Sequence, residues 1–131
     1  MPISFRPAPA GAVLAALALA GGGAVLASGT AAATTSTTVH LKASATGQLR
    51  FNTTHLTAKA GRVTVKMLNP SGSGLPHGIA VEGHGVDRDG KTVTSGHTST
   101  VTVTLKKGTY EFYCPVKGHK KAGMEGKLVV R

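Results

Sequence analysis

Two stretches of the chain alternate between apolar and polar side chains, and this pattern limits the fold more than any other feature. In RVTVKML, Val63, Val65 and Met67 alternate with Thr64, Lys66 and Leu68. The stretch STVTVTL repeats the alternation with β-branched residues. A period of two puts every second side chain on the same face of a β-strand, so both stretches are predicted to be half-buried strands.

Other short stretches extend this pattern into an all-β fold. Strands are expected in VHLKA, QLRF, HGIAVEG and TYEFYC. NPSGSGLP is rich in turn-forming residues, and GVDRDGKTV is expected to be a surface excursion around an Asp89-Gly90 turn. No helix of ordinary length is expected, since GHKKAG could hold one turn at most. About seven short strands separated by turns predict a Greek-key β-sandwich.

The first 33 residues are expected to lie outside this sandwich. After Arg6 comes a long run of Ala, Leu, Val and Gly, as in a secretory signal peptide, and Ala31–Ala33 offer a small-residue cleavage site. The alternative is an uncleaved anchor, although Gly11 to Leu26 is slightly short for a membrane span of roughly 20 residues. The protein is therefore expected to be exported, to a periplasm or to the extracellular cell envelope. Residues 34–38 are predicted to be a flexible Thr/Ser tract, and 39–131 the folded domain.

The charge balance of the remaining chain limits the kind of partner. Without Arg6 it has 14 Lys and Arg against 5 Asp and Glu, a net charge of +9. Such a charge attracts anionic surfaces: an acidic protein, or an anionic lipid or wall polymer of the envelope. Nucleic acid is not expected, because the chain is predicted to be exported, has few aromatic residues and contains no binding motif. The alternative is a solvated basic surface without a specific partner. We expect a monomer.

The only cysteine lies in a segment with an uncommon set of side chains. In YEFYCPVKGHKKAGMEGKLVVR, Cys114 precedes His119 by five residues and Met124 by ten. A single cysteine cannot form an intramolecular disulfide, so it is either a small buried hydrophobic residue or a metal ligand. Side chains alternate along a strand, which places Tyr110, Phe112 and Cys114 on one face, expected to be the inner one.

Thiolate, imidazole and thioether in one short loop suit copper better than other metals. A second histidine would complete a trigonal His2Cys site with a weak axial Met, the arrangement used for one-electron copper chemistry. His77 in GLPHGI is the candidate. Taken singly, a histidine is more often a surface residue and a methionine a core residue. The remaining histidines lack a partner at ligand spacing and are expected at the surface: His40, His55, His84 and His97.

PHGI together with YEFYCPVKGHKKAGMEGKLVV resembles the cupredoxins, the small blue-copper proteins of the plastocyanin and azurin family. The resemblance covers about Phe51 to Arg131. It implies one type 1 copper ion, with His77, Cys114 and His119 as in-plane ligands and Met124 as the axial ligand. The four-residue gaps between the last three ligands are similar to those of rusticyanin and auracyanin.

Two positions next to the expected ligands depart from the family pattern. Plastocyanins and azurins usually carry Asn after the first histidine and Ser or Thr after the cysteine; here Gly78 follows Pro76-His77, and Pro115 follows Cys114. Pro115 has neither a hydroxyl nor a backbone N–H. The side-chain brace between the two ligand loops is therefore missing, and the family's redox tuning does not carry over. Gly78 still offers a backbone N–H to the thiolate.

The resemblance implies a copper protein that passes single electrons between an exported redox donor and acceptor. The alternative is an exported protein that stores or delivers copper. An enzyme is not expected, since copper enzymes of the wider family need further His ligands or a second Cys. Near His119, three lysines form either a solvated rim or a docking patch for an acidic partner: Lys117, Lys120 and Lys121.

Overall fold

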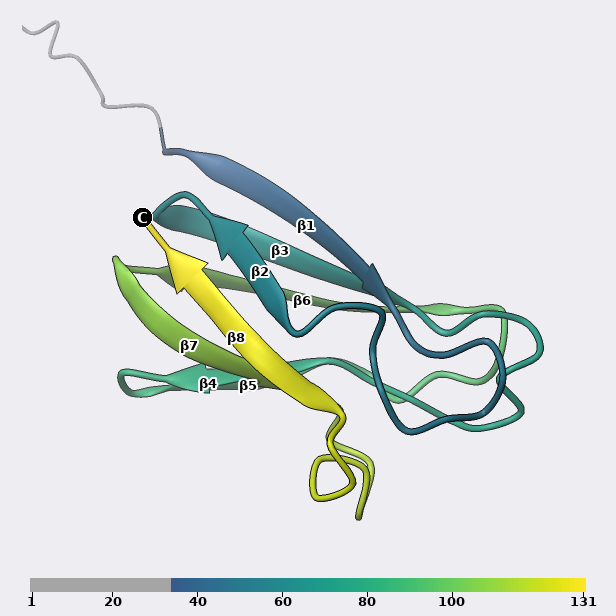
Figure 1. Ribbon diagram of the computed structural model, residues 1–131. Coiled ribbons are helices and arrows are strands. Elements are labelled where there is room, and N and C mark those ends of the chain that lie inside the picture. Colours follow the sequence, from purple (N-terminus) through teal and green to yellow (C-terminus); the bar gives the residue numbers. More distant parts are fainter. Residues whose placement is uncertain (1–33) are drawn as a thin grey trace, which may run out of the picture. The chain divides into compact units, whose positions relative to one another are not determined.

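The computed structural model describes residues 34–131, which form two β-sheets packed face to face (Figure 1). The predicted signal or anchor segment, 1–33, lies outside the described residues. Eight strands follow one another along the chain: β1 Ser36–Lys42, β2 His55–Ala58, β3 Gly61–Leu68, β4 Ala80–Gly83, β5 Val86–Asp89, β6 Thr98–Leu105, β7 Gly108–Tyr113 and β8 Glu125–Val130. Within the described residues, no membrane-spanning helix is found.

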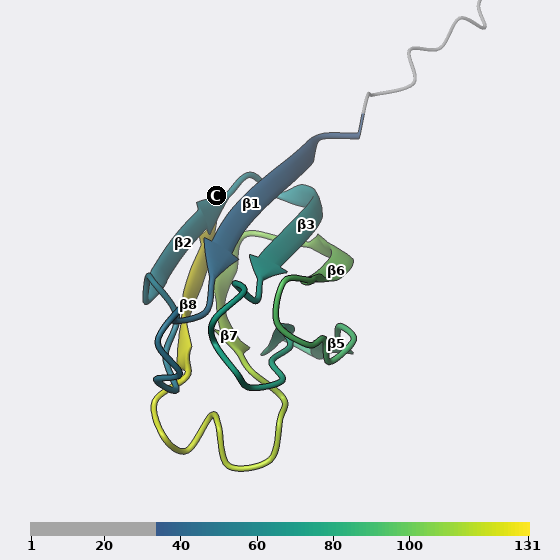
Figure 2. The same ribbon diagram turned by 90° about the vertical axis from the view of Figure 1, so that its right-hand side faces the viewer.

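The strands divide into a three-stranded sheet, β1-β3-β6, and a five-stranded sheet, β2-β8-β7-β4-β5. β1 runs parallel to β3 and β2 parallel to β8, whereas the other pairs are antiparallel. After β3 the chain crosses to the second sheet for β4 and β5, returns for β6, and crosses again for β7 and β8 (Figure 2). The predicted β-sandwich is confirmed.

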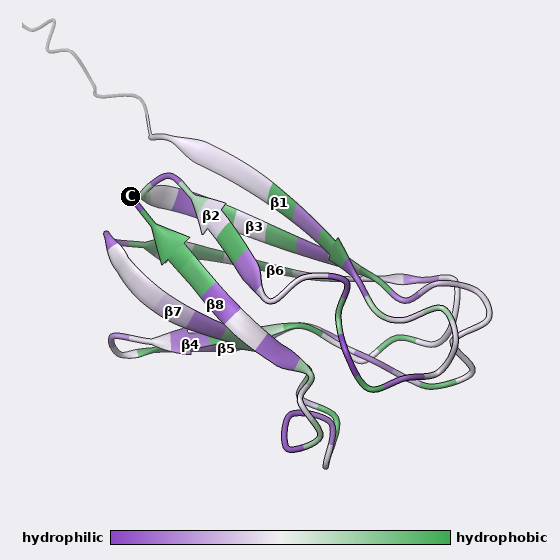
Figure 3. Ribbon diagram, viewed as in Figure 1, coloured by the Kyte–Doolittle hydropathy of each residue, from purple (hydrophilic) through white to green (hydrophobic). Residues whose placement is uncertain are grey.

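The alternating stretches supply the core between the sheets. In β3, Val63, Val65 and Met67 are completely buried, while their neighbours face outward. Bands of apolar and polar residues accordingly alternate along β1 and β3 (Figure 3). Phe112 and Leu128 of the five-stranded sheet are also completely buried. Burial of each such side chain contributes about 1.5–3 kcal/mol, so this alternation holds the two sheets together.

The N-terminal part of the domain differs from the prediction. Ser36, Thr37 and Thr38 belong to β1 and pair with β3, so most of the predicted flexible tract is strand. Thr is β-branched and favours a strand when a partner edge is available. QLRF is not a strand; only Phe51 makes an isolated bridge, to Ala43. The next strand is instead β2, which pairs in parallel with β8 at the opposite end of the chain.

The stretch predicted as a surface excursion forms a hairpin. β5 pairs with β4, and the turn between them is formed by His84 and Gly85 rather than by Asp89-Gly90. Both turn residues have positive φ, 50° for His84 and 82° for Gly85, as a type I′ turn requires. Charged side chains are frequent in this hairpin and conceal its strand character in the sequence: Asp87, Arg88 and Asp89 are exposed, and Glu82 is half-buried.

Candidate metal centre

Two loops approach each other at one end of the sandwich and carry all four predicted ligands. The β3–β4 loop contains His77. The β7–β8 loop contains Cys114, His119 and Met124, and it extends beyond the strands in both views (Figures 1 and 2). Loops held by rigid strands are common places for binding residues, because the scaffold fixes their positions.

Three donor atoms of these loops converge. The Nδ1 atoms of His77 and His119 lie 3.3 Å apart, and Cys114 Sγ lies 3.9 Å from the first and 3.5 Å from the second. A metal ion with bonds of about 2.0 Å to nitrogen and about 2.3 Å to sulfur, at the centre of such a triangle, would separate its donors by about 3.5–3.7 Å. The triangle therefore has the size that a single transition-metal ion requires.

Cys114 follows the last residue of β7 and points into the core. Tyr110, Phe112 and Cys114 are all buried, as the strand parity predicted, while Tyr113 is half-buried on the other face. Gly78 donates its backbone N–H to Sγ at 3.4 Å. Burial raises the pKa of the Cys114 thiol, and the backbone N–H groups of Gly78 and Val116 offset part of this rise. A metal cation would have to displace the thiol proton.

His77 is completely buried and held by backbone pairing with Val93. His77 N donates to Val93 O at 3.0 Å, and Val93 N donates to His77 O at 2.8 Å. Burial, and secondly the charge of His119, lower the pKa of His77, which keeps its ring neutral. Nδ1 faces the other two donor atoms, whereas Nε2 is buried without a hydrogen-bond partner in the described part of the chain. A neutral ring with Nδ1 directed at the cluster is what a metal ligand requires.

A buried asparagine that is not among the predicted site residues anchors this loop. Asn69 donates through Nδ2 to Leu75 O at 2.8 Å and to Val93 O at 2.9 Å, and its Oδ1 accepts from Ser73 Oγ at 2.6 Å. Ser73 Oγ also contacts Ser95 Oγ at 2.9 Å. Val93 is thus bound by both Asn69 and His77. The position of Asn69 directly before Pro70, at the end of a strand, was the available signal.

The β7–β8 loop is closed by its own backbone. His119 N donates to Val116 O at 2.9 Å, Met124 N to His119 O at 3.1 Å, and Cys114 N to Met124 O at 3.1 Å. Met124 is completely buried next to Cys114, while His119 is partly exposed. Burial lowers the pKa of His119 as well. These backbone bonds place the imidazole and the methionine next to the cysteine.

Gly78 and Pro115, the two departures from the family pattern, pack against each other. A Cβ atom at Gly78 would lie 3.3 Å from ring carbons of Pro115 and 3.2 Å from Lys91 O, so a side chain has little room there. At the position where other family members have a polar side-chain brace between the two loops, this protein therefore has close packing of Gly78 against Pro115. Pro76 is exposed and lies before His77 on the outer side of the loop.

The three lysines near His119 differ in their surroundings. Lys120 Nζ lies 2.8 Å from Glu82 and 3.3 Å from Glu111, and 4.1 Å from the centre of the Tyr113 ring. The hydrogen bond to Glu82 is the main cause of the raised pKa of Lys120. Lys117 and Lys121 are exposed. The other histidines are exposed as predicted: His40, His55, His84 and His97.

A thiolate and two imidazoles at one end of a β-sandwich define a small metalloprotein with a mononuclear sulfur and nitrogen site. The chain belongs to the plastocyanin/azurin family of copper-binding proteins, whose family model matches residues 37–131. The predicted family is confirmed, and copper is the cofactor. The donor set agrees, since copper combines soft sulfur with imidazole ligands.

Solved structures of two auracyanins and an amicyanin share the fold. Auracyanin B aligns with a TM-score of 0.63 and 24% identity over 72% of this chain and 88% of its own. Auracyanin A from Chloroflexus aurantiacus aligns with a TM-score of 0.57 and 22% identity, over 74% and 100%. Amicyanin from Paracoccus versutus aligns with a TM-score of 0.53 and 22% identity, over 72% and 81%. No curated protein sequence matches the chain significantly.

Proposed function

We propose that this protein is an exported one-electron carrier with a single type 1 copper site. The ligands are His77, Cys114 and His119, with Met124 as the axial ligand. The observation that carries the proposal is the triangle of two Nδ1 atoms and one Sγ atom, whose sides are 3.3, 3.5 and 3.9 Å. When bound, copper supplies a Cu(I)/Cu(II) couple.

The surroundings of the ligands suit a carrier that changes oxidation state with little movement. Cys114, His77 and Met124 are buried; Cys114 pairs with Met124 through the backbone of the β7–β8 loop, and His77 pairs with Val93 of the β5–β6 connection. Rigid ligands lower the reorganisation that electron transfer requires, since they need not move between the two states.

His119 provides the route between the site and a partner. It is the partly exposed member of the triangle and lies in the loop that extends beyond the strands. An imidazole that binds copper on one side and reaches solvent on the other brings the redox centre close to a docked protein. Lys117 and Lys121 beside it would attract an acidic donor or acceptor.

The similar solved structures support a redox role. Auracyanin A is described as a "blue" copper protein, and the crystal structure of another auracyanin, from Roseiflexus castenholzii, is of its dithionite-reduced form. That second structure aligns with a TM-score of 0.61 and 20% identity over 76% of this chain and 99% of its own. We propose the same reversible reduction for this protein, as a monomer without a catalytic step of its own.

Voltammetry of the copper-loaded protein tests the proposal. A carrier should give a reversible one-electron wave, and Cu(I) should stay bound in the presence of a moderate Cu(I) chelator. A storage or delivery protein would instead lose Cu(I) to the chelator within minutes and give no reversible wave. The buried positions of Cys114 and His77 favour the first result.

A further inference from the structure

The acidic side chains of the protein are confined to one of its two sheets. All five carboxylates of the chain lie in strands of the five-stranded sheet: Glu82, Asp87, Asp89, Glu111 and Glu125. The three-stranded sheet carries none. Its cations therefore face solvent without an acidic neighbour on their own sheet.

The outer face of the three-stranded sheet, which we call the Thr/Lys face, is regular. Strand register places its outward residues in four rows across β1, β3 and β6: Ser36–Arg62–Thr104, Thr38–Thr64–Thr102, His40–Lys66–Thr100 and Lys42–Leu68–Thr98. Seven of the twelve residues carry hydroxyl groups, three are Lys or Arg, and one is His. Thr64 and Thr102 hydrogen-bond to each other at 3.1 Å.

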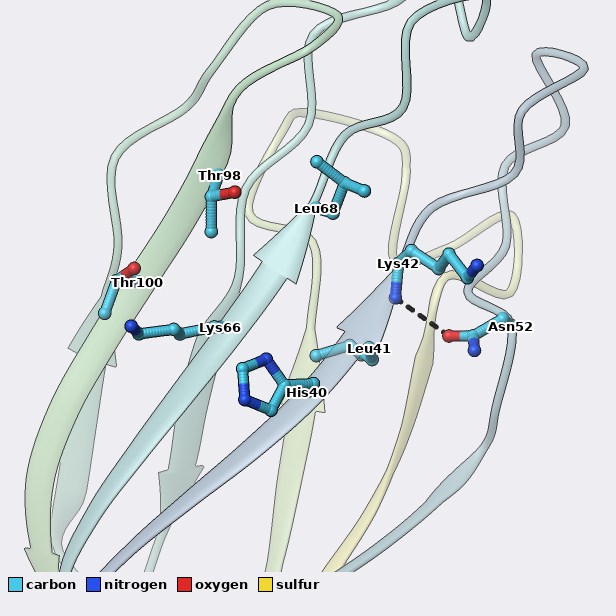
Figure 4. A pocket seen from close by; sticks show the side chains of 8 residues that line it. All are labelled: His40, Leu41, Lys42, Asn52, Lys66, Leu68, Thr98 and Thr100. Carbon is cyan, nitrogen blue, oxygen red and sulfur yellow. Dashed lines mark hydrogen bonds between the residues drawn. The ribbon is translucent and has the colours of Figure 1, made fainter.

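A groove of about 560 Å³ runs over this face. His40, Lys42, Lys66, Thr98 and Thr100 line it, together with Leu68. Figure 4 shows the Lys66 side chain extending toward Thr100, the His40 ring on the neighbouring strand, and Lys42 beside Asn52. Asn52 accepts a hydrogen bond from the Lys42 backbone at 2.8 Å. The groove thus offers ammonium groups and hydroxyls side by side.

This chemistry matches a linear polymer in which phosphate groups alternate with hydroxyl-bearing units. Ammonium and guanidinium groups pair with phosphates, and Thr hydroxyls donate to or accept from sugar or polyol hydroxyls. Neighbouring residues within a row are about 4.8 Å apart, and successive rows are about 6.6 Å apart along the strands, so these groups recur periodically. A repeating polymer can use several rows at once.

Other occupants fit less well. A folded protein partner would need an apolar centre with aromatic anchors, and Leu68 is the only exposed large hydrophobic residue among residues 34–131. A membrane surface would need apolar side chains that insert between lipids. Single-stranded nucleic acid would need aromatic side chains for base stacking, and the face has none besides His40.

From the charge division, the hydroxyl rows and the groove, we infer that the Thr/Lys face binds a linear phosphate-bearing polyol or sugar polymer of the cell envelope. None of its residues belongs to the two loops of the metal centre. A bound polymer would therefore hold the protein at the envelope while His119 stays open to redox partners. The inference is independent of the copper ligands.

Binding of fluorescently labelled poly(glycerol phosphate) to the copper-loaded protein, measured by anisotropy, tests the inference. If three cations each neutralise one phosphate, the logarithm of the association constant should fall with the logarithm of salt with a slope of about −2. Lys42→Gln with Lys66→Gln should weaken binding at low salt roughly fivefold for each lysine. The slope should fall to about −0.7, since one cation remains.

The matched control is Lys121→Gln with Lys127→Gln, which removes the same charge from the other sheet and its loop. It should keep nearly the full affinity and slope. Equal weakening in the two double variants, or no binding at all, would overturn the inference. So would tighter binding to phosphatidylglycerol vesicles or single-stranded DNA than to the polymer. Far-UV circular dichroism of the same samples shows whether each variant is folded, whatever the results for the polymer and for copper.

Discussion

Asn69 should determine the stability of the β3–β4 loop and hence the position of His77. Its side chain makes three hydrogen bonds inside the protein, to Leu75 O, Val93 O and Ser73 Oγ, and is completely buried. Asn69→Ala removes all three. Val93, whose backbone is paired with His77, then loses the hydrogen bond from Asn69 Nδ2 to its carbonyl oxygen.

The loss of stability in Asn69→Ala depends on which hydrogen bonds the former partners of Asn69 keep. Leu75 O still accepts from Ser73 Oγ at 3.3 Å, and Val93 O still accepts from His77 N, so neither carbonyl is left without a partner. The full cost of an orphaned buried group therefore does not apply, and about 1 kcal/mol per lost bond is appropriate. We expect Asn69→Ala to lower the free energy of unfolding by about 3 kcal/mol. For a domain of this size that corresponds to a fall in Tm of about 15 °C.

Thermal or urea unfolding of the copper-free protein measures this loss without a contribution from metal binding. Asn52→Ala is the matched control, because Asn52 is exposed and accepts one hydrogen bond, from Lys42 N. It should cost less than about 1 kcal/mol. Asn69→Asp, which keeps the shape but loses both donated bonds, should be at least as destabilising as Asn69→Ala. If Asn69→Ala and Asn52→Ala unfold alike, the buried network does not hold the loop.

Three further predictions concern the site and its rim. The copper-free protein should be most stable between about pH 6.5 and 9, measured by Tm against pH. The pKa values of His77 and His119 lie below their ordinary 6.5, so the unfolded state binds more protons at low pH and stability falls there. The raised pKa of Cys114, above its ordinary 9.0, means that the folded state retains a proton which the unfolded state loses, so stability also falls at high pH. Lys120→Gln should lower stability by less than about 1 kcal/mol, since its ion pairs are substantially exposed, and Lys117→Gln should leave unfolding unchanged. Lys117→Gln should nevertheless slow electron transfer to an acidic partner at low salt, and the difference should disappear at high salt in stopped-flow measurements.

Local sequence patterns predicted the β-sandwich and the part of the metal centre that the β7–β8 loop contributes. Val63, Val65 and Met67 are buried as their alternation requires, and parity placed Cys114 inward at the end of its strand. Both inferences depend only on neighbours within one strand. Cys114, His119 and Met124 likewise belong to one loop, so their proximity could be predicted from the sequence alone.

Features that depend on distant pairing could not be predicted. His77 is fixed by Val93 and Asn69, which are brought together by the folding of two separate connections. β2 is a strand because it finds the edge of β8, and its four residues carry no strong signal of their own. The packing of Gly78 against Pro115 joins the two loops across the fold. In each case the deciding contact is a tertiary one that overrides or replaces local preference.

The visible and EPR spectra of the protein loaded with one equivalent of Cu(II) test the central proposal most directly. Ligation by Cys114, His77 and His119 predicts an intense thiolate-to-copper absorption that disappears on reduction and returns on oxidation. Cys114→Ser should abolish the band, whereas Met124→Leu should keep it and shift the reduction potential. A colourless Cu(II) complex with an ordinary tetragonal EPR spectrum would contradict the type 1 site.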